Sequence, residues 1–371
     1  MDKLIAYKGF DKDLKCGDFQ YEVGKEYELP EGEKPEICSK GFHACESPLE
    51  VLDYYFMDDD VNMSRFCEVE LSGELLHEKN EGSKVASSKI KVKAEMKFAD
   101  FIKLGIEWLK EKTSSEKVGV KSKKYLNDNC NYSACAPASA QIGSTVDYAK
   151  ISSSGCSTQI GSSGDRAQIG SSGYLVKIGS SGYSAKIGSS GDSAQIASSG
   201  GRAQIGSVGE SAKISTSGYS AQIGSTGAFA QIGSTGDFTK IGSSGDFVKI
   251  GSTGDFAKIG SSGDSAQIAS SGSHVQIGSV GNFAKINTSG YSTQINSTGE
   301  ESVIMCAGRD SVVKTKKGSW ITLAEWYIDE ETEKMRPKCV KTEYVDGERI
   351  KEDTWYKLVD GEFVSLDTLE G

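Results

Sequence analysis

The chain has 371 residues, a length that allows two or three domains. Its contents of 37% hydrophobic and 25% charged residues are typical of globular proteins. A net charge of -10 disfavours a general nucleic-acid binder, which needs a basic face. The sequence has no apolar run near the roughly 18 residues of a membrane span, and its N-terminus lacks the hydrophobic core of a signal peptide. We therefore expect a cytoplasmic protein that binds neither nucleic acid nor membranes.

Composition divides the sequence into three parts. Residues 1–129 are charged and mixed, residues 130–313 are rich in Gly, Ser, Ala and Ile, and residues 314–371 are charged and contain Trp and Tyr. The net charges of these parts are -6, 0 and -4. The nine cysteines are an odd, scattered set, so we expect reduced thiols rather than a disulfide framework.

The first part, residues 1–129, is predicted to be a small α+β domain with a polar connector from residue 113. Its strand-like segments are residues 4–10, 19–29 and 65–73. Residues 47–56 predict a helix, with Ser47 at the N-cap, Pro48 in the first turn and Glu50 closing a capping box. A second helix is predicted over residues 99–112, where one stripe carries Ile102, Ile106 and Leu109.

Three short motifs follow one another in this domain: YKGF at Tyr7–Phe10, GFHACES at Gly41–Ser47 and EVE at Glu68–Glu70. Their order resembles the Tyr-Arg-Gly, Phe-x-Ser-x-Ser and Glu-x-Glu elements of ADP-ribosyltransferases. In that family the second Glu orients the NAD ribose, so the resemblance implies this role for Glu70. Lys8 stands where the family has Arg, and His43-Ala44-Cys45 replaces the Ser-Thr-Ser core. An active domain, a degenerate one and a chance pattern therefore remain as alternatives.

Metal and cofactor sites are not indicated. The thiols and imidazole of the first domain contain no CxxC pair and match no compact zinc module, although they include Cys16, Cys38, His43, Cys45 and Cys67. The sequence has no Ser-His-Asp set, no HExxH and no phosphate-binding loop. We expect no metal, no cofactor and no enzymatic activity.

The middle part is a nonapeptide repeat, in which Ile returns at every ninth residue from Ile142 to Ile304. A fixed period of this kind indicates a solenoid. Ala commonly stands two residues before the Ile, with Gln or Lys between them, and this alternation predicts a short strand. A Gly four residues after the Ile recurs from Gly155 to Gly308, and we expect it to supply a positive φ that turns the chain.

A longer duplication indicates the size of a coil. Residues 188–200 recur identically at 260–272, and the segment 201–227 matches 273–299 at 19 positions. The two copies are offset by eight nonapeptides, which is four coils of two nonapeptides but not a whole number of coils of three. The predicted fold is therefore mainly β, with residues 130–313 forming a two-sided parallel β-solenoid of two nonapeptides, or about 18 residues, per coil. Such a neutral rod presents a regular array of outward side chains.

The turns of the repeat carry the most informative side chains. Asp often follows the turn Gly, but Tyr, Gly and Ala occupy the same slot elsewhere, so the calcium cages of toxin-type nonapeptides are not predicted. A regular lattice of Lys177, Lys213, Lys249 and Lys285 is expected to form a solvated face. The slot two residues after the Gly is expected to point outward and to form two aromatic columns, a typical contact surface for a protein partner, from Phe229, Phe238, Phe247, Phe256 and Phe283.

The last part, residues 314–371, alternates strand-like runs with Asp-Gly turns and predicts a small antiparallel β domain. We expect both flanking domains to cap the open ends of the solenoid, because exposed sheet ends promote aggregation.

The motifs YKGFDKDLKC, GFHAC, SAQIGSSGD, GSWITLAEW and DTWYKLVDGEF together resemble phage and prophage proteins with a small N-terminal domain, nonapeptide solenoid and C-terminal β domain. These motifs imply a viral origin in a bacterial host cell but carry no assigned chemistry. The first hypothesis is a non-enzymatic scaffold that binds a protein partner, such as a host or defence factor, or a second copy of itself. The alternatives are an ADP-ribosyltransferase-like domain displayed on the solenoid and a virion decoration protein.

Overall fold

The computed structural model describes residues 3–366, apart from 53, 56–63, 79–82, 99, 103, 106–107, 109–124, 127–131 and 134–140. The chain forms two compact units: Met1–Ala194 with Ala203–Val208, and Gln195–Arg202 with Gly209–Gly371. The division falls within the nonapeptide repeats, so each unit contains several of them.

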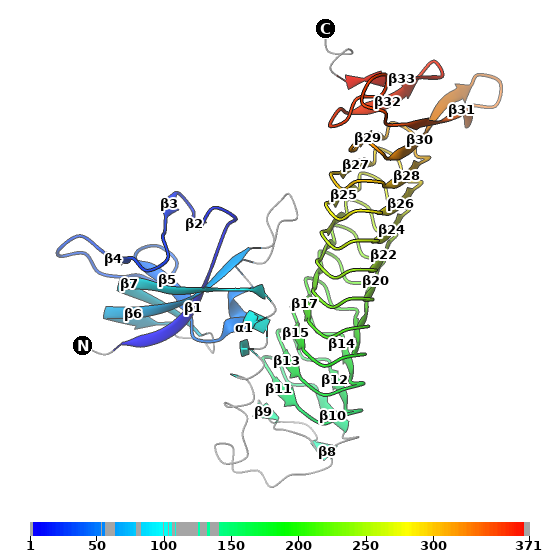
Figure 1. Cartoon of the computed structure of the whole chain (residues 1–371). Coiled ribbons are helices and arrows are strands. Elements are labelled where there is room, and N and C mark those ends of the chain that lie inside the picture. The colour runs from blue at the N-terminus through cyan, green and yellow to red at the C-terminus, as the bar shows by residue number, and fades with distance from the viewer. Residues whose placement is uncertain are drawn as a thin grey trace. The chain divides into compact units, whose positions relative to one another are not determined.

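The N-terminal domain is built on a five-stranded sheet in the order β4-β7-β5-β1-β6 (Figure 1). An additional pairing of β7 with β6 closes four of these strands into a ring, whose interior holds an apolar cluster that includes Phe10, Val69 and Ile90. All of these pairings are antiparallel. The strands are β1 (Leu4–Phe10), β4 (Glu26–Glu28), β5 (Phe42–Cys45), β6 (Arg65–His77) and β7 (Lys84–Met96), and a small hairpin joins β2 (Lys15–Cys16) to β3 (Phe19–Gln20).

The predicted capping box does not form. Helix α1 (Pro48–Val51) has Ser47 at its N-cap, but the Ser47 side chain makes no cap hydrogen bond. Glu50 instead accepts hydrogen bonds from the backbone N–H and the hydroxyl of Ser83, both at 2.6 Å. The Glu50 carboxylate therefore binds Ser83, from a distant part of the chain, instead of the N-terminal end of its own helix.

The second predicted helix is present where the structure describes it, since the described residues between 98 and 108 are helical. Ile102 is buried as expected, whereas Ile106 and Leu109 lie outside the described residues. Ile102 and Phe101 join α1 and Phe66 in a second apolar cluster. This cluster packs on the outside of the ring of strands.

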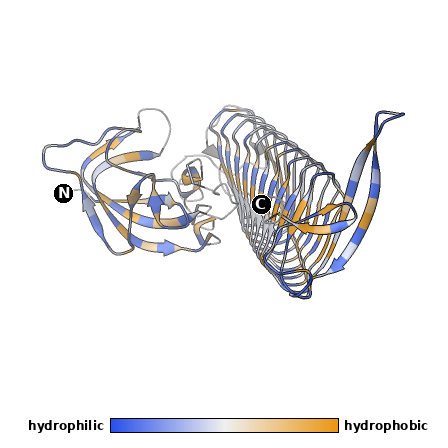
Figure 2. Cartoon of the chain, turned by 90° about the horizontal axis from the view of Figure 1, so that it is seen from above, coloured by the Kyte–Doolittle hydropathy of each residue, from blue (hydrophilic) through white to orange (hydrophobic). Residues whose placement is uncertain are grey.

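The repeats form two parallel sheets whose strands alternate along the chain, so that two strands make one coil. Strands of one sheet pair in register two nonapeptides apart, as Ile142 with Ile160 and Ile151 with Ile169. This confirms the predicted coil of two nonapeptides. Seen along the stack, the hydropathy bands of successive coils are aligned (Figure 2). Every Ile from Ile142 to Ile304 is at most 4% exposed, so the two sheets meet in a core of Ile, Ala and Ser.

The first sheet contains β8 (Tyr125–Leu126), β10 (Gln141–Ser144), β12 (Gln159–Ser162), β14 (Lys177–Ser180), β16 (Gln195–Ser198), β18 (Lys213–Thr216), β20 (Gln231–Ser234), β22 (Lys249–Ser252), β24 (Gln267–Ser270), β26 (Lys285–Thr288), β28 (Val303–Cys306), β30 (Trp320–Asp329) and β31 (Lys334–Tyr344). The second contains β9 (Tyr132–Ser133), β11 (Lys150–Ser153), β13 (Gln168–Ser171), β15 (Lys186–Ser189), β17 (Gln204–Ser207), β19 (Gln222–Ser225), β21 (Lys240–Ser243), β23 (Lys258–Ser261), β25 (Gln276–Ser279), β27 (Gln294–Ser297), β29 (Val312–Lys314), β32 (Tyr356–Val359) and β33 (Glu362–Ser365).

The role expected of the turn glycines is wrong. Positive φ is found two residues later, at non-glycine positions such as Ser220 and Phe238. The repeat glycines are required by space instead, because a Cβ on Gly236 would lie 2.1 Å from the carbonyl oxygen of Gly218 in the preceding coil. Equivalent clashes recur along both edges of the coils, with the carbonyl oxygen at 1.8–2.1 Å.

The two flanks meet the repeats differently. The C-terminal hairpins continue the sheets as a cap does: β30 pairs parallel with β28, and β32 pairs with β29. At the other end β8 and β9 add to β10 and β11. The N-terminal domain with its closed ring of strands, which we call the N-terminal barrel, does not add a described strand there. The barrel instead lies on the face of the second sheet, where Gln204 donates a hydrogen bond to the carbonyl of Leu52. Among the described residues, no helix combines the length and apolarity that crossing a membrane requires.

Candidate functional site

The five predicted aromatic side chains all lie in the turns between strands. Each of these phenylalanines has a φ of 55–58°, in the left-handed region that costs an L-residue about 1 kcal/mol. The backbone N–H of Phe238 donates to the carbonyl of Asp255 at 2.8 Å, and that of Phe256 donates to the carbonyl of Ser273 at 2.8 Å. These bonds between neighbouring coils fix the turns and direct the rings outward.

One edge of the solenoid carries a long aromatic column, which comprises Tyr219, Phe238, Phe256, His274 and Tyr291. Phe238 and Phe256 stack with ring centroids 4.8 Å apart and planes 7° apart, and Phe256 stacks on His274 at 4.9 Å and 9°. The Tyr219 ring is tilted against the Phe238 ring with centroids 5.2 Å apart, and the Tyr291 ring lies edge-on to His274 with centroids 5.2 Å apart. The column therefore extends over five consecutive coils.

The opposite edge carries a short aromatic column, in which Phe229 and Phe247 stack at 5.3 Å and 8°. Ser265 occupies the next coil of this column and separates Phe247 from Phe283. The sequence therefore places the five phenylalanines on two edges correctly, but the structure joins only four of them, in two pairs.

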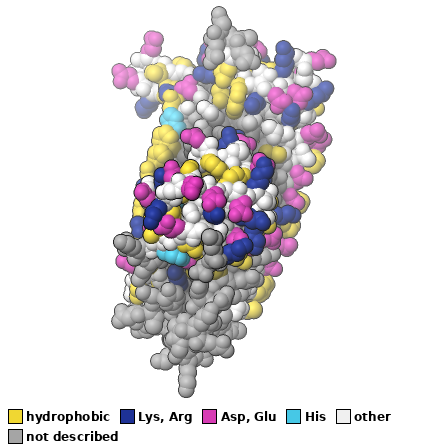
Figure 3. Space-filling model, turned by 90° about the vertical axis from the view of Figure 1, so that its left-hand side faces the viewer, with side chains coloured by type: hydrophobic (Ala, Val, Ile, Leu, Met, Phe, Trp, Pro, Cys, Tyr) yellow, Lys and Arg dark blue, Asp and Glu magenta, His cyan; other side chains and the backbone are white. Residues whose placement is uncertain are grey.

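Exposure distinguishes these rings from core residues. The exposed fractions of the five phenylalanines are 44–53%. In the space-filling view, hydrophobic side chains form a strip beside a histidine (Figure 3). Contiguous exposed aromatic surface of this kind commonly marks an interface. Because the stacked rings cover one another's faces, the columns present mainly ring edges, which can pack against apolar and aromatic groups of a partner.

Both ends of the long aromatic column were missed by sequence reasoning. Tyr219 and Tyr291 lie one position before the predicted slot, directly after the turn Gly, and Arg309 follows in the next coil with its guanidinium 4.5 Å from the Tyr291 ring. The period of two nonapeptides aligns Tyr219 with Asp237 and Tyr291 with Ser273, so the sequence alone does not place these two rings in the column.

The recurrent turn Asp residues have a structural role in the described coils. Asp237 Oδ1 accepts the backbone N–H of Asp255 at 2.9 Å, and Asp255 Oδ1 accepts that of Ser273 at 2.7 Å. Each carboxylate thus binds an amide of the next coil and connects one turn to the next. This contact explains why Asp follows the turn Gly.

The motifs that resemble ADP-ribosyltransferases lie on neighbouring strands but not at one site. Tyr7 pairs with Glu68 across β1 and β6, and with Cys45 across β1 and β5. Lys8 is buried, donates to the carbonyl of His43 at 2.8 Å, and has a pKa lowered by its burial. Glu70 is aligned with Ile5, so alternation along the strand places it on the sheet face opposite Lys8.

Glu70 and Glu68 are occupied by ion pairs. Lys3 contacts Glu70 at 2.8 Å and lowers the pKa of that carboxyl through a hydrogen bond, and Lys93 contacts Glu68 at 2.9 Å. These partners neutralise the two carboxylates on the outer face of β6.

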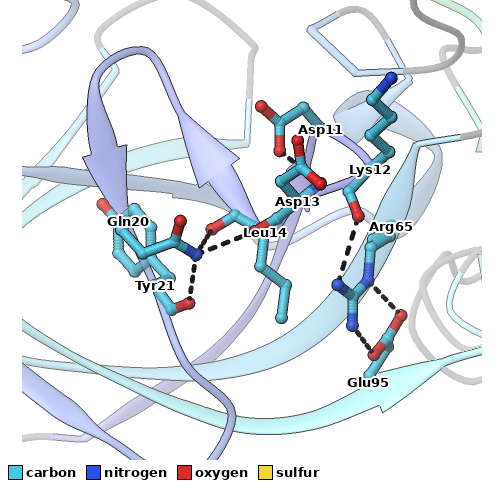
Figure 4. Close-up of polar contacts among 8 residues, drawn as sticks. All are labelled: Asp11, Lys12, Asp13, Leu14, Gln20, Tyr21, Arg65 and Glu95. Carbon is cyan, nitrogen blue, oxygen red and sulfur yellow. Dashed lines mark hydrogen bonds and ion pairs between the residues drawn. The ribbon is translucent and has the colours of Figure 1, made fainter.

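A second polar cluster of the domain is structural (Figure 4). Arg65 forms two hydrogen bonds to the carboxylate of Glu95, at 2.7 and 2.5 Å, and a third to the carbonyl of Lys12 at 3.3 Å. The Gln20 amide donates to the carbonyls of Asp13 and Tyr21. The cluster fixes the segment between β1 and β3.

The thiols of the barrel have separate surroundings. Cys67 is buried, and burial raises its pKa to about 12, while Cys16 and Cys38 accept hydrogen bonds from Lys8 and Lys84. In the part of the chain that the structure describes, no three His, Cys, Asp or Glu side chains are grouped for a metal ion.

The fold defines a β-solenoid repeat protein with an N-terminal antiparallel domain and C-terminal hairpins. Residues 4–104 match the model of a family described as a domain of unknown function, DUF7666. This match covers the N-terminal barrel and leaves the repeats and the C-terminal hairpins outside it. Neither a curated protein nor a solved structure matches the chain.

Proposed function

We propose that the chain is a non-enzymatic scaffold whose solenoid binds a protein partner through the long aromatic column. The observation that carries this proposal is the continuous row of ring contacts from Tyr219 to Tyr291, exposed along one edge and held by turns in a strained conformation. Burial of its rings by a partner removes apolar surface from water at about 25 cal/mol per Å².

The rigidity of the column favours binding. Its rings already contact one another, so a partner does not have to order them, and less conformational entropy is lost on association. Tyr291 and Arg309 extend the surface with polar and charged groups, which are common in protein interfaces beside aromatic residues. The partner is a host or defence factor or a second copy of the chain.

The test is a charge reversal on the column. The double variant Phe238→Asp and Phe256→Asp should weaken partner binding at least about tenfold, because a partner must then desolvate two carboxylates. Its circular dichroism spectrum should equal that of the unmodified chain, since Asp already occupies the same slot at Asp310. Unchanged affinity with an unchanged spectrum would contradict the proposal.

A phage or prophage origin and a bacterial cytoplasmic location belong to the same proposal. They rest on the resemblance of the YKGF, GFHAC and nonapeptide motifs to phage-type proteins. A virion decoration protein is the alternative, and it predicts a stoichiometric band in purified particles. Recovery in the infected cell but not in particles supports the scaffold.

A further inference from the structure

The N-terminal barrel docks on a defined set of repeat side chains. Within the first unit, Gln204 Nε2 donates to the Leu52 carbonyl at 2.9 Å, and Gln168 Nε2 donates to the Glu50 carboxylate at 2.9 Å. Outward side chains of a sheet are normally exposed, but here Gln168, Lys186 and Gln204 are 5–8% exposed. The barrel therefore covers the outer face of β13, β15 and β17.

Two further features of this face are specific to the contact. At Gly206 a Cβ would lie 2.8 Å from Ile102 Cδ1, so a side chain at this position would have to displace the end of the Ile102 side chain. Val208 packs against the apolar cluster that contains Ile102. We call Lys186, Gln204, Gly206 and Val208 the first docking site.

The sequence contains this set a second time. The duplication over eight nonapeptides places Lys258, Gln276, Gly278 and Val280 at the equivalent positions, which we call the second docking site. The local pairing is also the same, because β15 pairs with β17 as β23 pairs with β25. Val at this slot is confined to Val208 and Val280; Ser or Thr stands there in the other repeats, and Ala307 in the last.

The second docking site differs from the first in being open. Val280 is 63% exposed, the highest fraction among the large hydrophobic side chains described, and Gln276 is exposed as well. A Cβ added to Gly278 would meet nothing within 4 Å, in contrast to Gly206. An exposed Val in a slot otherwise occupied by Ser or Thr has no role within its own coil that the contacts show.

We propose that the second docking site binds the N-terminal domain of a second copy of this chain. Its Gly278 leaves space for Ile102, its Gln276 amide can donate to the Leu52 carbonyl, and its Val280 covers the apolar cluster around Ile102. This surface is separate from the aromatic columns, so the inference does not depend on their function.

The charges support this occupant. Lys240 stands in the second site where Gln168 stands in the first, which places an ammonium group opposite Glu50. A charged donor forms a stronger hydrogen bond to a carboxylate than a neutral amide does. Because each chain has one N-terminal domain, the dimer forms by domain exchange, which conserves the number of docked domains.

Matched glycine substitutions test the proposal on the full chain. Light scattering after size exclusion, over a range of concentrations, should show a monomer–dimer equilibrium. Gly278→Gln fills the space for Ile102 and should lower the dimer association constant at least about tenfold. Gly206→Gln displaces the domain from its own site and should raise the dimer fraction. Gly251→Gln is the matched control, because a Cβ on Gly251 would also meet nothing within 4 Å but this glycine lies on the first sheet, and it should leave the equilibrium unchanged.

Cross-linking identifies the donor of the domain. Equal amounts of nitrogen-14 and nitrogen-15 chains are mixed and treated with a cross-linker that is amine-reactive at one end and photoreactive at the other. Lys97 is exposed and next to Phe98, which lies beside Gly206. We therefore expect Lys97 to join residues 276–280 in peptides of mixed label, while its product with residues 204–208 within one chain reports the first site. A monomer at every concentration, an unchanged equilibrium in Gly278→Gln, or products of Lys97 with residues 276–280 that carry a single label would each overturn the proposal.

Discussion

The N-terminal barrel and the solenoid reach a buried core by opposite means. The barrel buries large, different side chains, and its Phe66 and Phe101 rings stack at 4.3 Å. The solenoid buries one small set, Ile, Ala and Ser, many times over, and limits the space around its turn glycines. We therefore expect the loss of stability on substitution to depend on the size of the buried side chain in the N-terminal domain. In the solenoid we expect it to depend on the position of the residue within the repeat.

The largest expected effect is in the barrel. Phe66→Ala removes a ring that is 1% exposed and should lower the free energy of unfolding by about 4 kcal/mol. Phe247→Ala removes a ring that is 53% exposed and should cost less than about 1 kcal/mol. Urea unfolding monitored by circular dichroism measures both changes, and equal losses would refute the contrast.

The next effect concerns the slot rather than the size. Gly236→Ala adds one methyl group 2.1 Å from the Gly218 carbonyl oxygen and should destabilise the chain by about 3 kcal/mol. Gly233→Ala adds the same group where nothing lies within 4 Å, and it should stabilise the strand by about 0.5 kcal/mol. The midpoints of thermal unfolding should therefore move in opposite directions, and a common direction would rule out the steric explanation.

A smaller effect is expected from the buried hydroxyls. Thr239 donates to the Gly236 carbonyl at 2.6 Å and accepts from Ser234 at 3.0 Å, so Thr239→Val should cost about 1 kcal/mol. Val248 occupies the same slot of the next repeat, and the nearby Ser243 hydroxyl has no hydrogen-bond partner among the described residues. The reciprocal Val248→Thr should cost less, because it supplies that partner. Calorimetry compares the two, and similar losses would exclude this pairing.

The smallest effect is electrostatic and depends on pH. The Arg65 guanidinium lowers the pKa of Glu95 below its usual 4.5. The stabilisation is therefore complete above pH 4.5 and is lost as the pH falls through the lower pKa of the folded state. Since both side chains are partly exposed, Arg65→Gln should cost about 0.5 kcal/mol at pH 7 and almost nothing near pH 2. A difference that persists at low pH would disprove the assignment.

The solenoid could be predicted from the sequence because one period determines both the strands and their pairing. The position of Ile142 in the repeat predicts that it is buried, and the coil of two nonapeptides predicts that it pairs with Ile160. The barrel has no such period, and the strands of residues 42–45 and 84–96 were not predicted. The role of the turn glycine was also misjudged, because the clash at Gly236 arises from a neighbouring coil rather than from the glycine's own dihedral angles.

The candidate site was predicted in part for the same reason. Phe238 and Phe256 followed from one slot of the repeat, whereas Tyr219 and Tyr291 entered the column from the adjacent slot, which only the turn geometry brings into line. The docking of Glu50 on Gln168 joins residues 118 positions apart and is not encoded in any local pattern.

The most direct test of the scaffold compares the two aromatic columns in one binding measurement. Phe238→Ser with Phe256→Ser interrupts the long column, and Phe229→Ser with Phe247→Ser removes the short one; Ser already occupies this slot with positive φ at Ser220 and Ser265. Full-length chains carrying either pair are used to capture partners from the cells that produce the protein, with isotope-labelled unmodified chain as the reference. Selective loss of a partner with the first pair is the predicted result, and equal retention by all three chains would contradict the account.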